Sequence, residues 1–326
     1  MWDAGPSGVN LFIIHAAGGG ATFLKPTIIV HGGAGSGRYG SGDPRHAGLV
    51  GAVEAGLAAL RKGSAVDGAM AAVECMEDSG LFNCGKGAYL TAGGKMELDA
   101  AVMSGEGLAG AGVGSVTSTH NPVALARWVM ENTRHVLLVG GPTRDYARLA
   151  GLEVEELTPT KPVAARFEAM KREAKFAGDV RIVDRFSAKD TVGAVALGSD
   201  GVPASAVSTG GMWMKLPGRV GDSAILGAGL FADSNLGASC ATGTGEEIIR
   251  VGLCMKACEF MEADDAKRAA ARAIEHITKV RGRGTAGIIT VDLKGRVGAA
   301  FNTEAMGRAW FDHEKGRVVA TVGPDS

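Results

Sequence analysis

The chain has 326 residues, 46% of them hydrophobic, and a net charge of −1. These values are typical of a soluble globular protein with a large core, and the balanced charge gives no reason to expect binding to nucleic acid or to a membrane surface. The five cysteines are scattered and odd in number, which argues against a disulfide framework and favours a reducing, cytoplasmic compartment.

The segment before the first clear strand, GVNLFIIHAAGGGATFL (residues 8–24), is apolar. It makes a poor signal peptide, because Asp3 precedes it and no basic residue does. No apolar stretch in the sequence reaches the length of a membrane-spanning helix. We therefore expect residues 1–25 to form an N-terminal extension outside the fold.

The first half of the chain carries signals for strands and helices in turn. Two helix starts are marked by cap residues, Asp43 before a proline and Ser64 with Asp67 three positions later. Two glycines at 93–94 separate two alternating runs and indicate a hairpin. The expected elements are a strand at 27–35, helices at 43–62 and 64–77, a hairpin at 88–103, a strand at 112–117, a helix capped by Asn121, a strand at 135–140 and two helical stretches up to about 176.

Between residues 177 and 190 neither the helical nor the strand period is visible, which predicts a mobile linker. The second half is expected to contain a hairpin at 191–209, a glycine-rich loop, two helices between 245 and 280, and hairpins turning at 294–295 and 315–316. Hairpins together with consecutive helices argue against a repeated strand–helix–strand unit. They predict an α+β protein of antiparallel sheets covered by helices.

A glycine motif, GSGRYG, follows the first strand, with glycines at 35, 37 and 40. It matches the pattern that brings a dinucleotide pyrophosphate onto a helix N-terminus. In that fold the helix returns to a parallel strand, whereas here it runs into a second helix. The pattern therefore favours a structural turn.

Three further groups fit structural roles better than functional ones. His31 is a lone histidine beside glycines, which favours a hydrogen-bonded structural residue over a general base. Glu97 and Asp99 share one face of a strand but lack any partner motif. Cys254 and Cys258 lie four apart on an expected helix without a second pair of ligands, which favours buried thiols over a zinc site.

Polar side chains with complementary chemistry lie in the glycine-rich stretch from 205 to 247. Arg219 and Asp222 are three residues apart and can face one ligand. The guanidinium can hold a carboxylate with two parallel hydrogen bonds, and the aspartate can hold an ammonium. The pair can therefore form a clamp for an amino acid, or an ion pair that stiffens the loop, and the residues alone leave both interpretations open.

The motif TGTGEE (242–247) opens a helix, and its backbone N–H groups could form an oxyanion hole, although Thr244 could also be an ordinary helix cap. No base-activated nucleophile motif accompanies it. Thr191 could act instead if cleavage made it an N-terminus, because an α-amine with a pKa of about 7.7–8.0 can accept a proton near neutrality. A linker that ends at Asp190 is a suitable place for that cleavage.

Six motifs, in this order, give the chain a clear likeness to a known family: HGGAG (31–35), LFNCGKGAYLT (81–91), ELDAAVMSG (97–105), DTVGAVAL (190–197), STGGMWMKLPGRVGDS (208–223) and ATGTGEE (241–247). The chain resembles, from residue 27 onward, the plant-type asparaginase/isoaspartyl aminopeptidase family of N-terminal-nucleophile hydrolases, to which the glycosylasparaginases are related. The resemblance implies a four-layer αββα sandwich, one domain built from an α-subunit part (26–190) and a β-subunit part (191–326). It also implies self-cleavage before Thr191 and a dimer of αβ units, (αβ)2.

The resemblance also implies roles for individual residues. No cofactor is implied for catalysis, but a structural sodium ion is. The implied site consists of Thr191 as nucleophile, Thr209 beside it, Thr242 and Gly243 as oxyanion hole, Arg219 and Asp222 for the substrate's α-carboxylate and α-amine, the Gly245 carbonyl for its ammonium, and a sodium loop of backbone carbonyls at Met76, Glu77, Phe82, Cys84 and Lys86.

Some residues depart from the family pattern. Asp190 stands where many asparaginases have glycine, as in glycosylasparaginases, and Lys189 stands where histidine is common. Trp213 and Met214 replace smaller polar residues. We expect a threonine amidohydrolase that releases L-aspartate from L-asparagine and β-aspartyl dipeptides. The alternatives are a glycosylasparaginase acting on N-linked glycosyl-asparagine and an uncleaved, non-catalytic binding protein.

Overall fold

The structure, a computed structural model, describes residues 24–35, 42–177 and 190–323. Most of the expected N-terminal extension, the glycines at 37 and 40, and linker residues 178–189 with Lys189 lie outside the described residues. The helices of the described part are α1 (Pro44–Leu60), α2 (Ala65–Ser79), α3 (Pro122–Asn132), α4 (Thr143–Leu149), α5 (Lys161–Ala177), α6 (Gly245–Val251), α7 (Leu253–Phe260) and α8 (Ala266–Arg281).

The strands form two sheets, so the expectation of a mixed α+β protein is confirmed. The larger sheet has the order β12-β11-β1-β5-β6-β2-β3-β4 and the smaller one the order β10-β9-β8-β7. Their bounds are β1 (Thr27–Gly35), β2 (Leu98–Ser104), β3 (Gly110–Val116), β4 (Leu137–Val139), β5 (Val192–Leu197), β6 (Pro203–Thr209), β7 (Leu230–Asp233), β8 (Gly237–Gly243), β9 (Ala286–Asp292), β10 (Val297–Phe301), β11 (Ala305–Asp312) and β12 (Arg317–Thr321). In the described part of the chain, neighbouring strands pair antiparallel except β3 and β4, which are parallel.

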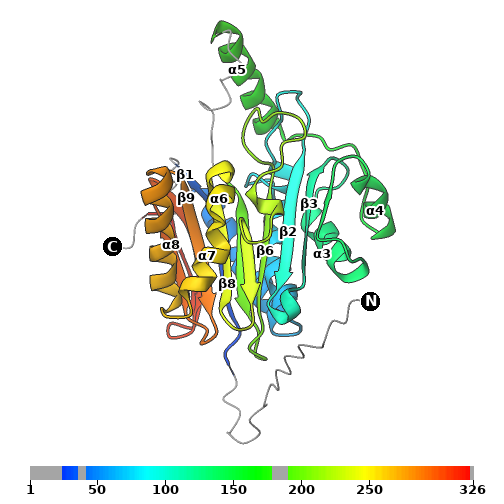
Figure 1. The fold of residues 1–326 in the computed structure, drawn as a ribbon. Coiled ribbons are helices and arrows are strands. Elements are labelled where there is room, and N and C mark those ends of the chain that lie inside the picture. Colours follow the sequence, from blue (N-terminus) through cyan, green and yellow to red (C-terminus); the bar gives the residue numbers. More distant parts are fainter. Residues whose placement is uncertain (1–23, 36–41, 178–189, 324–326) are drawn as a thin grey trace, which may run out of the picture.

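Three apolar clusters explain how the elements pack. The first lies between α1, α2 and α3 and the larger sheet, the second between the two sheets, and the third between the smaller sheet and α6, α7 and α8. Ile28 and Val30 belong to the first cluster and Ile29 between them to the second, because successive strand residues point to opposite faces. Figure 1 shows α7 and α8 covering β8 and β9 on the near side.

The local caps at the first two helices are confirmed. Asp43 accepts a hydrogen bond from the backbone N–H of Arg45, and Ser64 and Asp67 form a reciprocal capping box. Asn121 and Pro122 stand at the start of α3 as predicted, but the Asn121 side chain makes no cap hydrogen bond. Its side chain instead donates to the carboxylate of Glu77 at 3.3 Å, and the same carboxylate accepts the N–H of Val123.

Two predictions need correction. The hairpin at 88–103 is reduced to a single bridge between Leu90 and Met96, because β2 pairs with β3 and β6 instead. The two helices between 245 and 280 are three, because Gly252 adopts the left-handed conformation (φ +57) between α6 and α7. The hairpins β5–β6, β9–β10 and β11–β12 are confirmed.

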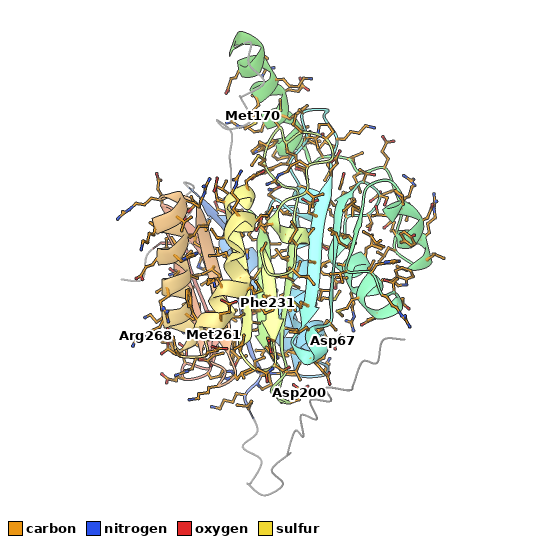
Figure 2. All side chains as sticks on the ribbon, in the orientation of Figure 1. Asp67, Met170, Asp200, Phe231, Met261 and Arg268 are labelled. Carbon is orange, nitrogen blue, oxygen red and sulfur yellow. The ribbon has the colours of Figure 1, made fainter. Side chains whose placement is uncertain are left out.

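The β5–β6 turn and the start of β5 lie at opposite ends of the larger sheet. Asp200, in the β5–β6 turn, lies at the lower end in Figure 2. The start of β5 therefore lies at the opposite end. Cys254 and Cys258 are buried free thiols, as expected. Over the residues that the structure covers, no helix is both long and apolar enough to cross a membrane.

Candidate active site

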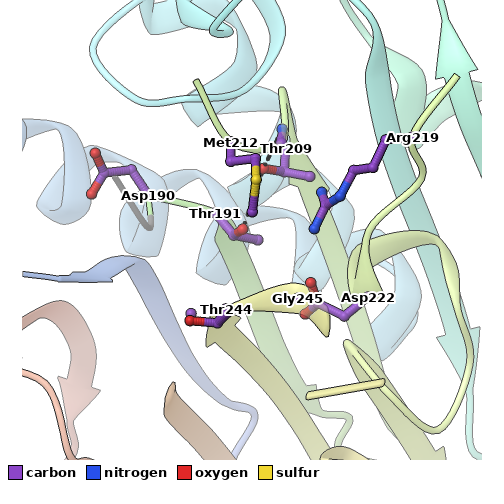
Figure 3. A pocket seen from close by; sticks show the side chains of 10 residues that line it. Asp190, Thr191, Thr209, Met212, Arg219, Asp222, Thr244 and Gly245 are labelled. Carbon is purple, nitrogen blue, oxygen red and sulfur yellow. Dashed lines mark hydrogen bonds between the residues drawn. The ribbon is translucent and has the colours of Figure 1, made fainter. Parts of the chain in front are cut away.

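Thr191 immediately precedes β5, a strand held on both sides by β1 and β6. Its side-chain hydroxyl donates a hydrogen bond to the hydroxyl oxygen of Thr209 at 3.2 Å. Thr209, the last residue of β6, also accepts the backbone N–H of Gly211 at 3.0 Å. The pairing of β5 with β6 thus brings the predicted nucleophile and its predicted neighbour together, as Figure 3 shows.

One small cavity unites most of the predicted site. Its volume is about 20 Å³, which holds about one water molecule and is too small for an amino acid. In Figure 3, Asp190 lies on one side of Thr191, and Arg219 and Asp222 lie on the other. The lining residues are Asp190, Thr191, Thr209, Gly211, Met212, Arg219, Asp222, Gly243, Thr244 and Gly245.

The side chain of Asp190, the residue before Thr191, is held in place by its neighbours. The hydroxyl of Tyr89 donates to the Asp190 carboxylate at 2.6 Å, and the Tyr89 ring stacks on Trp213 with centroids 4.1 Å apart. Burial raises the pKa of Asp190, with the Tyr89 hydrogen bond and the Arg45 charge opposing it. Trp213, one of the departures from the family pattern, thus packs against the residue that holds the predicted cleavage site.

His31 contacts the nucleophile's backbone, not its hydroxyl. Its Nδ1 lies 3.1 Å from the Thr191 carbonyl oxygen and its Nε2 lies 3.3 Å from the Cys240 sulfur. Burial lowers the pKa of His31 to about 3, so the ring is neutral and donates its Nδ1–H to that carbonyl. This geometry agrees with the structural role expected for His31.

Arg219 and Asp222 line the same cavity but have different partners. The Arg219 guanidinium forms two hydrogen bonds of 2.9 Å with the Glu246 carboxylate, so the ion pair considered between Arg219 and Asp222 is replaced by one with Glu246. Asp222 is buried, and its Oδ2 has no hydrogen-bond partner among the described residues. Burial raises the pKa of Asp222 to about 7, with the positive charge of Arg219 opposing the shift.

The segment from Thr242 to Gly245 passes beside this pair. Gly243 has φ +144, and a Cβ atom there would lie 2.2 Å from the Thr285 carbonyl oxygen, so only glycine fits. Thr244 stands at the N-cap of α6 without a side-chain cap bond, so ordinary capping does not explain it. Thr242 does not line the cavity, and its buried hydroxyl has no partner within the described ranges.

The predicted sodium loop lies at the end of α2 and in the turn after it. The Phe82 carbonyl accepts the Cys84 N–H at 2.8 Å, and a Cβ on Gly85 would lie 2.4 Å from the Glu77 carbonyl oxygen. Each carbonyl oxygen keeps a second lone pair, and hard cations take oxygen ligands. The sodium site that these carbonyls would form stays a prediction. Side chains do not offer an alternative, since the described residues contain no group of three or more His, Cys, Asp or Glu that could hold a metal.

Sequence reasoning missed three residues at this site. Glu246 holds Arg219, Tyr89 holds Asp190, and the side-chain amide of Asn83 donates to the Gly211 carbonyl at 2.6 Å. All three lie inside quoted motifs, Asn83 and Tyr89 in LFNCGKGAYLT and Glu246 in ATGTGEE, so the motifs contained them without indicating their partners.

Comparison with known proteins shows the family to which the chain belongs. A family model described as asparaginase matches residues 24–321. A plant-type L-asparaginase of Pyrobaculum calidifontis is 44% identical over 87% of this chain and 96% of its own length. One of Pyrococcus abyssi is 42% identical over 87% and 95%, and a human isoaspartyl peptidase/L-asparaginase is 36% identical over 93% and 97%.

Proposed function

Because the chain belongs to this asparaginase family, we propose that it is a self-cleaving threonine amidohydrolase that releases L-aspartate from L-asparagine and from β-aspartyl dipeptides. One observation supports this proposal above the others. The hydroxyl of Thr191, bonded to Thr209 at 3.2 Å, faces a cavity that also contains Arg219 and Asp222. A nucleophile and the two charged groups that recognise an amino acid thus share one site.

The first step of the proposal is self-cleavage. The Thr191 hydroxyl attacks the Asp190 carbonyl carbon, its proton passes to the departing nitrogen, and the peptide bond is exchanged for an ester. Water then hydrolyses the ester, which leaves a carboxylate on Asp190 and frees the Thr191 hydroxyl and amine. The small volume of the uncleaved cavity supports this order, since departure of Asp190 makes room for a substrate.

The second step is hydrolysis of the substrate amide. The free amine of Thr191 takes the proton of its own hydroxyl, which attacks the side-chain amide carbon. Thr242 and Gly243 stabilise the tetrahedral oxyanion. The amine returns the proton to the leaving nitrogen, ammonia or an amino acid departs, and water hydrolyses the acyl-enzyme to L-aspartate.

Substrate orientation follows from the charges beside Thr191. Arg219 binds the α-carboxylate, and Asp222 with the Gly245 carbonyl binds the α-ammonium. Glu246 accepts from Nε and Nη2 of this guanidinium, so its negative charge opposes the substrate's α-carboxylate. The unpartnered oxygen of Asp222 gains a cationic partner, which compensates for burial of that carboxylate.

The wider organisation also belongs to this proposal. The two sheets and three apolar clusters support a four-layer αββα arrangement. The larger sheet combines β1 to β4 with strands that follow Thr191, so both fragments would stay together after cleavage. The αβ units pair as (αβ)2, sodium held by the carbonyls of residues 76–86 stabilises the turn after α2, and the free cysteines suit a cytoplasmic enzyme.

The intact mass of purified protein tests the proposal, followed by assays of aspartate release. We expect two fragments that separate between Asp190 and Thr191, and activity on L-asparagine and β-aspartyl dipeptides. The Thr191→Ala variant should lose both cleavage and activity, whereas Thr191→Ser should keep some of each. A cleaved and active Thr191→Ala variant would refute the scheme. Activity confined to N-linked glycosyl-asparagine would favour a glycosylasparaginase, and an uncleaved, inactive wild type would favour a binding protein.

A further inference from the structure

Arg219 and Asp222 are carried by a loop that we call the clamp loop (residues 210–224). Three buried charged side chains connect this loop to the start of β2. They are Glu97 and Asp99, at the start of β2, and Lys215, within the clamp loop itself. Their exposed fractions are 8%, 0% and 1%. None of them lines the cavity, so the chemistry proposed above does not use them.

The two carboxylates hold the backbone on both sides of Arg219. Glu97 Oε2 accepts the N–H of Gly218 at 2.7 Å, and Asp99 Oδ2 accepts the N–H of Gly221 at 3.0 Å. Hydrogen bonds to a charged acceptor are shorter and stronger than those between neutral groups. The backbone that carries the guanidinium is therefore fixed at the residue before it and at the residue between it and Asp222.

Lys215 ties the same loop to the same strand. Its Nζ donates to the Glu97 backbone carbonyl at 2.8 Å and lies 3.6 Å from the Asp99 carboxylate. Its own carbonyl accepts the N–H of Ala92 at 2.9 Å. Burial of a lone carboxylate is costly, and the nearby ammonium compensates for the charge of Asp99.

We propose that Glu97, Asp99 and Lys215 are positioning residues that set the place of Arg219 and Asp222 and thereby the affinity for the substrate's α-carboxylate and α-ammonium. This inference rests on the proposed function, because the clamp is part of it. Asp99 pairs with Thr209 through the backbone of β2 and β6, but the Thr209 hydroxyl bonds to Thr191 and to the Gly211 N–H and not to this network. Loss of the network's side chains should therefore weaken substrate binding without preventing self-cleavage.

Asp99 uses both carboxylate oxygens as hydrogen-bond acceptors, so a substitution that removes one of them tests the proposal directly. Its two oxygens each accept a backbone N–H, Oδ1 from Ser115 at 2.8 Å and Oδ2 from Gly221 at 3.0 Å. An amide has only one acceptor oxygen, so Asp99→Asn must lose one of these bonds. Glu97 uses Oε2 alone for Gly218 and for the Ser115 hydroxyl, so Glu97→Gln can keep both bonds and should have the smaller effect.

The test compares steady-state kinetics on L-asparagine with thermal unfolding and intact mass. For Asp99→Asn we expect complete self-cleavage, a nearly unchanged kcat and a KM raised about tenfold, as for lost uniform binding. The matched control is Asp292→Asn, another buried carboxylate that accepts several backbone N–H groups. Ala286, at the first position of β9, pairs with Gly243 of the site, whereas Asp292 is the last residue of β9 and lies at the opposite end of that strand. The control should therefore lose stability but keep its KM.

Each outcome decides the matter. If Asp99→Asn does not fold, Glu97→Ala, which removes only the acceptor of Gly218 and Ser115, should raise KM in its place. A folded Asp99→Asn or Glu97→Ala variant with the wild-type KM would overturn the positioning role, as would the same rise of KM in Asp292→Asn. A wild-type protein without activity on either substrate would overturn the proposed function, and this inference with it.

Discussion

Glu246 competes with the substrate in the proposed mechanism, and removing its charge should improve substrate binding. Its carboxylate forms two hydrogen bonds of 2.9 Å with the Arg219 guanidinium. These bonds use Nε–H and one Nη2–H of the five N–H groups, so the substrate's α-carboxylate would share the guanidinium with a second negative charge. Glu246→Gln keeps the size of the side chain but removes its negative charge, so the amide should release Arg219 more readily.

The structure limits the size of the effect. The Arg219 side chain is 18% exposed and the Glu246 side chain 39% exposed, so water screens the pair substantially. Exposed ion pairs contribute up to about 1 kcal/mol, and bidentate geometry places this pair near that upper value. Since about 1.4 kcal/mol corresponds to a tenfold change in affinity, we expect KM for L-asparagine to fall about fivefold.

The assay is aspartate release under steady-state conditions, with the amount of cleaved protein determined by mass. The KM should fall while kcat stays the same, because the lost competition affects binding alone. Glu247→Gln is the matched control, since this neighbouring carboxylate pairs with Arg250 and Arg281 and does not reach the clamp. An unchanged or higher KM in Glu246→Gln would refute the reasoning and would mean that Glu246 supports Arg219 during binding.

Four further predictions concern three residues of the site. Because burial raises the pKa of Asp222 to about 7, KM should rise as the pH falls below about 7 and the carboxyl becomes neutral. The same shift destabilises the unliganded fold as the pH rises through about 7, so Asp222→Asn should unfold at a higher temperature than the unaltered chain at about pH 8. Gly243→Ala should lower the free energy of unfolding, measured in urea, by more than about 2 kcal/mol, since its Cβ would lie 2.2 Å from the Thr285 carbonyl oxygen. Tyr89→Phe should slow self-cleavage about tenfold in a mass time course, because the Asp190 carboxylate loses its 2.6 Å hydrogen bond.

Much of the fold could be predicted because its signals are local. The caps at Asp43 and at Ser64 with Asp67 lie within three residues of their partners. Hairpin turns are equally local, and β5–β6 was found at its expected place. Asn121 does stand at the N-cap of α3, but its amide donates to Glu77, a contact across 44 residues that no local pattern indicates.

In the candidate site, too, residues within local motifs could be predicted, whereas contacts between distant parts of the chain could not. Motifs identified Thr191, Arg219 and Asp222 as candidates, and the structure places all three around one cavity. Glu97 and Asp99 were interpreted as residues without partners, because the N–H groups that they hold lie 121 and 122 residues further along the chain. No spacing rule relates a buried carboxylate to a backbone N–H at such a distance.

The position of Thr191 at the start of a strand has a physical reason within the proposed mechanism. A new N-terminus is ordinarily free to move, and a mobile amine could not serve its own hydroxyl. Here β5 pairs with β1 and β6 from its first residues, Gly193 with His31 and Val192 with Ser208. The neutral His31 ring also donates to the Thr191 carbonyl at 3.1 Å. Only the bond to Asp190 needs to break, and the amine and the hydroxyl then remain where the sheet already holds them.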